Sequence, residues 1–219
     1  MFKDYAKRLI ICMLGLAVCG LGNYMSVKAG AVGTNSWTSL AIGISGKAAM
    51  SFGSATFLVS VAVIVIDLIG RGKLGIGSIL NAIFIAAFSD LFLNLLAFIP
   101  TASNQLLGIV FTLAGQTLVS FGTILYMTAA LGCGPRDTLM VIIGKKLPRL
   151  PIGAVRFCLE CAVLVVALLL GAPFGLGTVA VMLLQATIFQ FACNVCRYEP
   201  RNVEHEDLID TYKRIKEAL

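Results

Sequence analysis

Charged residues are scarce in this sequence, and their scarcity excludes most soluble proteins. Only 13% of the 219 residues are charged and 58% are hydrophobic, with a mean hydropathy of +0.94. A soluble domain carries about 25% charged residues. Packing six uniformly apolar helices into a soluble domain would leave no polar faces for its surface. The sequence therefore predicts an integral membrane protein whose main partner is the lipid bilayer.

Histidine and the common catalytic motifs are also lacking. The one histidine, His205, lies among acidic residues and is expected to be solvated. The sequence has no P-loop, hydrolase elbow, metalloprotease helix or dinucleotide fingerprint. We therefore expect neither an enzyme nor a cofactor. The net charge of +6 is assigned to membrane topology, so it does not indicate nucleic acid.

The seven cysteines do not form a pattern that predicts disulfides or a metal site. Cys158 and Cys161 form one Cys-x-x-Cys pair, and Cys193 and Cys196 form another, which is the spacing of a four-thiolate zinc site. Each pair, however, lies on a continuous apolar run and not in a zinc-binding turn. We expect unpaired thiols and no metal.

Six apolar runs have the length of a bilayer-crossing helix and predict an all-α, polytopic fold. The predicted spans are residues 9–27, 52–69, 76–98, 107–127, 152–170 and 175–193. If the N-terminus is cytoplasmic, eleven Lys and Arg residues fall on the inner side and only Lys28 and Lys47 on the outer side. This asymmetry predicts a multi-pass protein of the bacterial cell membrane with both termini in the cytoplasm. Residues 197–219 are expected to form a cytoplasmic amphipathic tail.

The sequence also indicates an internal repeat with an offset of 100 residues. Gly22 matches Gly122, and Gly53 matches Gly153. The motif Gly-x-Gly-Ser/Thr opens a span at residue 75 and again at residue 175. The predicted repeats are residues 1–100 and 101–196. Because each repeat holds three spans, the second must enter the bilayer from the opposite side, which gives an inverted repeat.

Glycine-rich breaks follow the first and fourth spans, each leading into a short helical stretch. The helix-break glycines are Gly30, Gly33, Gly132 and Gly134. Each stretch is too short to span, so it is either an interfacial helix or a half-helix that dips into the protein. One interpretation is that both helix N-termini face a shared site for an anion or polar solute. The other is that they are structural turns on opposite faces.

Motifs in the second half carry a resemblance to a known family that covers most of residues 9–190. The segments 132–140, 152–156 with Glu160, and 171–178 resemble the YczE/YitT-like bacterial membrane proteins, most closely the YczE branch. In that family both halves tend to carry a Gly-Pro-x-Asp-like element. The second half has Asp137 in that element, whereas the first has Thr38 where an acid is expected. The resemblance implies a multi-pass cell-membrane protein of unsettled biochemical role and supplies no substrate.

Ionisable residues at membrane depth are candidates for function. Asp90 lies deep in the third span, with Asn81 on the same span and Gln190 at the equivalent place of the second half. Asp90 is interpreted either as a proton or cation site or as a packing residue. Asp67 lies near a span end and is expected to reach the interface.

Arg156 and Glu160 are four residues apart and share a helix face. They form either an internal ion pair or, with Arg136, a site where the arginines bind an anionic group while Glu160 titrates.

These residues favour a small-solute transporter or permease with a site between inverted halves. The candidate site residues are Asp90, Gln190, Arg156, Glu160, Asn81, Arg136 and Asp137. The solute would be small and either polar or anionic. The alternative is a non-transporting membrane scaffold or accessory protein; a channel and a substrate-binding subunit of an importer are less favoured. Assembly with a second copy of the chain stays open.

Overall fold

A computed structural model describes residues 2–72, 74–150, 152–198 and 206–208. Within these ranges the chain forms eight α-helices and one short 3₁₀ helix and no strand, so the predicted all-α class is confirmed. The elements are α1 (Phe2–Lys28), η1 (Gly30–Val32), α2 (Ser36–Ala48), α3 (Phe52–Ile69), α4 (Ile76–Leu95), α5 (Gln105–Thr128), α6 (Pro135–Lys146), α7 (Ile152–Leu169) and α8 (Leu176–Cys196). Most of the predicted cytoplasmic tail, including His205, lies outside the described residues.

Five helices in the described part of the chain are long and apolar enough to cross a membrane: α1, α3, α4, α5 and α8. The prediction of a multi-pass membrane protein is supported at this level. The span predicted over residues 152–170 corresponds to α7, which has 18 residues. The third span ends at Leu95, earlier than expected, because the chain leaves the helix in a turn over residues 96–98.

The two short helices predicted after the glycine-rich breaks are present. α2 has 13 residues and α6 has 12, which gives each a length of about 20 Å, too short to cross a bilayer. Asn35 caps α2 by accepting a hydrogen bond from the Thr38 amide at 3.0 Å, and α6 begins with Pro135 at its first position. Gly33 and Gly132 adopt φ values of +81° and +128°, which explains glycine at these breaks.

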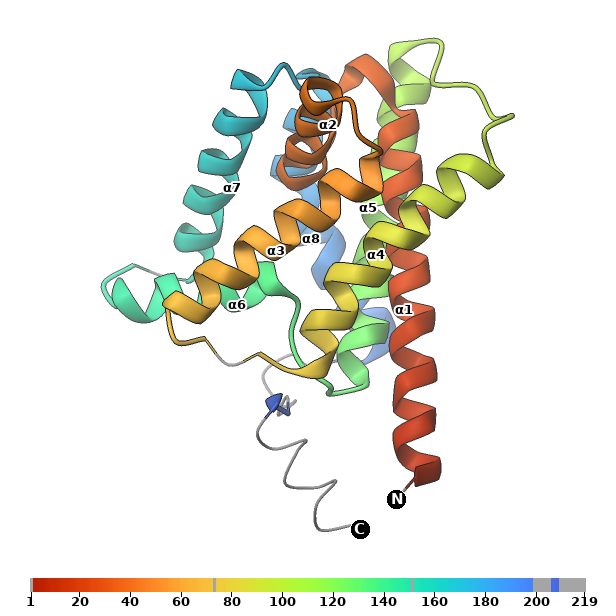
Figure 1. The fold of residues 1–219 in the computed structure, drawn as a ribbon. Helices are drawn as coiled ribbons and strands as arrows, with labels where there is room; N and C mark the ends of the chain where they lie inside the picture. Colours follow the sequence, from red (N-terminus) through yellow and green to blue (C-terminus); the bar gives the residue numbers. More distant parts are fainter. Residues whose placement is uncertain (1, 73, 151, 199–205, 209–219) are drawn as a thin grey trace.

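The centre of the fold is the crossing of α1 and α5, which lie side by side along the molecule (Figure 1). Glycines allow their backbones to touch. A Cβ atom at Gly15 would lie 2.7 Å from the Gly122 carbonyl oxygen, and one at Gly22 would lie 2.6 Å from that of Gly115. The two contacts are related by the offset of 100 residues, and the helices cross antiparallel. Small residues permit such close approach between membrane helices.

A second pair of contacts follows the same offset. Gly75 and Gly77, at the start of α4, lie against the chain at Leu131 and Gly132. Gly175 and Gly177, at the start of α8, lie against Val32 and Gly33. In both contacts, the first residues of a helix from one half of the chain pack against the glycine-rich break of the other half.

The short helices pack between α3 and α7. Figure 1 shows α2 and α6 at opposite ends of the molecule, with α3 crossing between them. An apolar cluster from these four helices joins them: Trp37, Val59, Val63 and Leu139, with Leu159 and Val163 packed alongside. Burial of these side chains holds the N-terminal turns of α2 and α6 beside one interior cavity.

Candidate functional site

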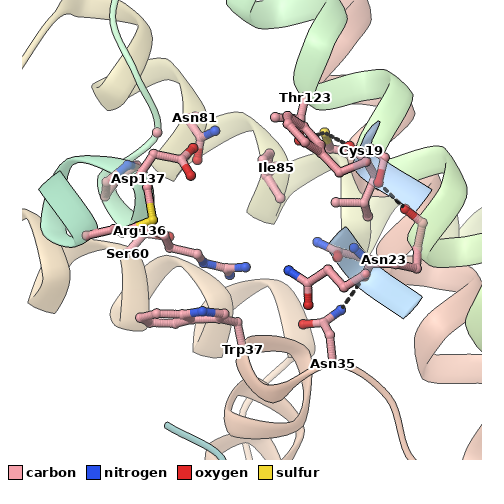
Figure 2. A pocket seen from close by; sticks show the side chains of 18 of the residues that line it. Cys19, Asn23, Asn35, Trp37, Ser60, Asn81, Ile85, Thr123, Arg136 and Asp137 are labelled. Carbon is pink, nitrogen blue, oxygen red and sulfur yellow. Dashed lines mark hydrogen bonds between the residues drawn. The ribbon is translucent and has the colours of Figure 1, made fainter. Parts of the chain in front are cut away.

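A polar cavity lies at the centre of the helix bundle (Figure 2). It has a volume of about 140 Å³ and is lined by side chains from all eight α-helices. Five predicted site residues line it together: Asn81, Arg136, Asp137, Arg156 and Glu160. The break residue Gly134 lines it as well. The N-terminal residues of both α2 and α6 face this cavity, so the positive ends of two helix dipoles border it.

Much of the lining comes in pairs that are 100 residues apart. The pairs are Cys19 and Val119, Asn23 and Thr123, Asn35 and Pro135, Trp37 and Asp137, Thr56 and Arg156, Ser60 and Glu160, and Ile85 and Gln185. At this offset Trp37, and not Thr38, is the counterpart of Asp137. Much of the cavity is therefore lined by positions that the predicted offset of 100 residues relates, although the paired residues differ in chemistry.

All charged side chains of the cavity come from the second half of the chain. They are Arg136, Asp137, Arg156 and Glu160. At the equivalent lining positions the first half supplies the neutral residues Trp37, Thr56 and Ser60. The site thus has a charged side and a neutral polar side.

Trp37 connects two of the charged residues across the halves. Its indole Nε1 donates a hydrogen bond to Glu160 Oε1 at 3.2 Å. The guanidinium carbon of Arg136 lies 4.9 Å from the centroid of the Trp37 ring, a cation–π contact. The guanidinium of Arg136 stays charged at pH 7.

The ion pair expected between Arg156 and Glu160 is not formed. The guanidinium of Arg156 lies over the Phe189 ring, 6.0 Å from its centroid, whereas Glu160 bonds to Trp37. Sharing one helix face brought the two residues to the same cavity. Their side chains then turn toward different aromatic partners, which spacing along a helix cannot reveal.

The neutral side of the cavity is a group of amide side chains, labelled in part in Figure 2. Asn35 Nδ2 donates to Gln116 Oε1 at 3.4 Å, while Asn35 Oδ1 caps α2. Asn23 Nδ2 donates to the Ser89 hydroxyl at 3.3 Å. Asn23, Asn35 and Gln116 are each less than 10% exposed. These residues were not predicted, because neutral amides within apolar runs give little signal in a sequence.

Comparison with known proteins places the chain in a family. The family described as "Family of unknown function (DUF6198)" matches residues 6–194. The chain belongs to the DUF6198 family. The "Uncharacterized membrane protein YczE" of Bacillus subtilis is 28% identical over 193 residues, which cover 88% of each chain. The predicted resemblance to the YczE branch is therefore confirmed.

Two further relatives match most of the chain. An "Uncharacterized protein" of Haemophilus influenzae is 38% identical over 189 residues, 86% of this chain and 84% of that protein. The "Uncharacterized protein YyaS" of Bacillus subtilis is 25% identical over 166 residues, 75% of this chain and 82% of that protein. No solved structure matches the chain.

The structure places Asp90 and Gln190 outside the cavity. Asp90 Oδ1 accepts a hydrogen bond from the Gly53 amide at 2.6 Å, and Oδ2 accepts one from the Ser51 hydroxyl. Asp90 thus caps the N-terminus of α3 from the neighbouring helix. Gln190 is exposed and donates to Asn194 Oδ1 at 3.0 Å. Their assignment to the solute site stays a prediction that the cavity does not support.

Asp90→Ala is expected to weaken folding without altering the cavity. Loss of a helix cap typically lowers the free energy of unfolding by about 1–2 kcal/mol. Thermal unfolding of the purified protein in detergent measures this loss. If the variant were as stable as the wild type, Asp90 would not be a helix cap. If it were as stable but bound solute with a different affinity, Asp90 would belong to the solute site.

Asp67 is a buried carboxyl group that the sequence did not indicate. It was expected to reach the interface, but its exposed fraction is 0%, and within the described part of the chain neither carboxylate oxygen has a hydrogen-bond partner. The reason is packing: α6 lies over the end of α3, where Ile142 contacts Gly70 and Gly72. The distance of a residue from a span end did not predict this cover.

Proposed function

We propose that this DUF6198 protein is a transporter of small polar solutes, with its site in the central cavity. The observation that carries the proposal is the cavity itself, where four charged side chains meet inside an apolar bundle. Ionisable groups at membrane depth are expensive and usually mark substrate or ion pathways. A non-transporting scaffold would gain nothing from a cavity of this kind, and apolar packing would be more stable.

We also infer that residues 1–100 and 101–196 are inverted repeats of three spans each. The reciprocal contacts of α1 with α5 support this, as does the cavity lining with its offset of 100. In inverted-repeat transporters the substrate site lies near the midplane, where broken helices from both halves meet. α2 and α6 would be the half-helices of this plan, because both begin at the cavity.

Uptake into liposomes tests the proposal. Purified protein is reconstituted and supplied with a broad panel of small polar solutes, and Glu160→Gln serves as the site variant. Gln190→Ala is the control, because Gln190 is exposed and outside the cavity. We expect uptake of one solute class that Glu160→Gln reduces and Gln190→Ala preserves. Neither uptake nor thermal stabilisation by any solute would favour the scaffold alternative.

The proposed location is the bacterial cell membrane with both termini in the cytoplasm. Cys196 ends α8 and is exposed, so an impermeant maleimide should label it only after the cells are opened. Ser103 lies in the exposed loop between α4 and α5, on the side predicted to be external. A cysteine placed there (Ser103→Cys, with Cys196→Ser) should be labelled in intact cells. Labelling of Cys196 in intact cells would show that the protein has the opposite orientation, with its C-terminus outside.

A further inference from the structure

The two arginines and Glu160 of the cavity are not paired with one another. Among the described residues, Arg136 and Arg156 have no carboxylate oxygen within 4.0 Å, and Glu160 has no Lys or Arg nitrogen within that distance. Glu160 bonds instead to the Trp37 indole, and the arginines lie over Trp37 and Phe189. Each of these three charges thus has an aromatic partner in place of an opposite charge.

Leaving these charges unpaired is energetically unfavourable unless a bound ligand supplies an opposite charge to the arginines and another to Glu160. The four charged side chains are each partly exposed toward the cavity, where opposite charges attract more strongly than in bulk water. A ligand with its own positive and negative ends could satisfy both. Its carboxylate would accept hydrogen bonds from the guanidinium groups, for which arginine geometry is well suited. Its ammonium would donate to Glu160, since one hydrogen bond from Trp37 leaves that carboxylate further acceptor capacity.

We propose that the cavity binds a small zwitterion, such as a short amino acid. The ammonium group lies at Glu160 and the carboxylate at Arg136 and Arg156. This inference rests on the proposed function, because it names the solute class of the same cavity. The net formal charge of the lining is zero, with two arginines balanced by Asp137 and Glu160. A zwitterion preserves that balance, whereas an anion or a cation would add an uncompensated charge at low dielectric.

The neutral side limits the ligand further. Asn23, Asn35 and Gln116 offer hydrogen bonds but no charge. Gln116 Oε1 already accepts a hydrogen bond from Asn35 Nδ2. A second carboxylate or ammonium on this side would lack a counter-charge, so dicarboxylates and diamines are disfavoured. The volume of about 140 Å³ also restricts the site to a small molecule.

Binding to a series of linear amino acids tests the proposal. The probes run from glycine to 6-aminohexanoate and differ only in the number of methylene groups between the charges. Calorimetry and thermal unfolding in detergent report binding without requiring transport. Because the protein charges are fixed, one chain length should bind at least tenfold more tightly than the ends of the series. Propionate and propylammonium, which carry one charge each, should not stabilise the protein.

Variants of the lining residues test which protein groups bind the charged ends of the ligand. Glu160→Gln keeps an acceptor for Trp37, so the fold should persist while zwitterion affinity falls at least tenfold. Gln190→Ala should bind as the wild type does. Propionate binding as tightly as the best zwitterion would overturn the proposal and leave an anion site. Failure of every amino acid to bind would also overturn it.

The two proposals fail separately. Liposome uptake of a solute that is not a zwitterion would refute the solute class but leave the transporter. Tight zwitterion binding without any uptake would refute the transporter and leave the site.

Discussion

Gly122→Leu is expected to prevent the protein from folding stably in a membrane. A Cβ atom at Gly122 would lie 2.7 Å from both the Gly15 carbonyl oxygen and Cys19 Sγ. The nearest obstacle is backbone, so α1 and α5 would have to separate. Overpacking typically lowers the free energy of unfolding by about 1–3 kcal/mol, and here it acts on the central helix pair, where the backbones themselves must separate.

The measurement is the unfolding midpoint in detergent, compared with Gly46→Ala. Gly46 lies in α2 with no other atom within 4 Å of its would-be Cβ, so alanine there should be neutral or stabilising by about 0.5–1 kcal/mol. Gly22→Leu should be as damaging as Gly122→Leu, because the offset of 100 makes the two positions equivalent. If Gly122→Leu unfolded like Gly46→Ala, the close crossing would be wrong.

Arg136→Gln is expected to reduce solute uptake by about 10–150-fold. Hydrogen bonds to charged groups contribute about 1.5–3 kcal/mol, and Arg136 is a donor on the charged side of the cavity. Arg136→Lys should recover little, because an ammonium lacks the planar fork and the stacking that places arginine on Trp37.

The control is Arg149→Gln, which removes an arginine from the exposed segment after α6. It should transport at the wild-type rate. The rates are compared at equal amounts of folded protein in the liposomes. Equal loss in Arg136→Gln and Arg149→Gln would show that the effect reflects overall charge, which contradicts a local role for Arg136.

The sequence predicted elements whose signals are strong and local. Long apolar runs marked α1, α3, α4, α5 and α8, because span length is set by bilayer thickness. Glycine and proline marked the breaks before α2 and α6, because few other residues allow such turns. Arg156 and Glu160 stood out as charges within an apolar run, and both line the cavity.

The remaining site depends on contacts between distant helices. The position of Trp37 at the cavity depends on its packing against α3, α6 and α7, which are distant in the sequence. An aromatic residue by itself does not indicate such a role, because aromatic residues are common in membrane proteins. Asp90 had the expected signal of an intramembrane acid, but its neighbour proved to be the N-terminus of α3. Depth along a helix can be counted from a sequence. The sequence does not show in which direction the side chain points or which neighbours it contacts.

Access to the cavity from the two membrane faces tests the transporter most directly. Ser60 lines the cavity, is nearly buried and is the counterpart of Glu160. Ser60→Cys, in a protein whose seven native cysteines are replaced, is treated with an impermeant thiosulfonate from either side of oriented vesicles. A transporter predicts reaction from both sides, and a transported solute should slow both reactions. Reaction from one side only, or from neither, would contradict alternating access to this cavity.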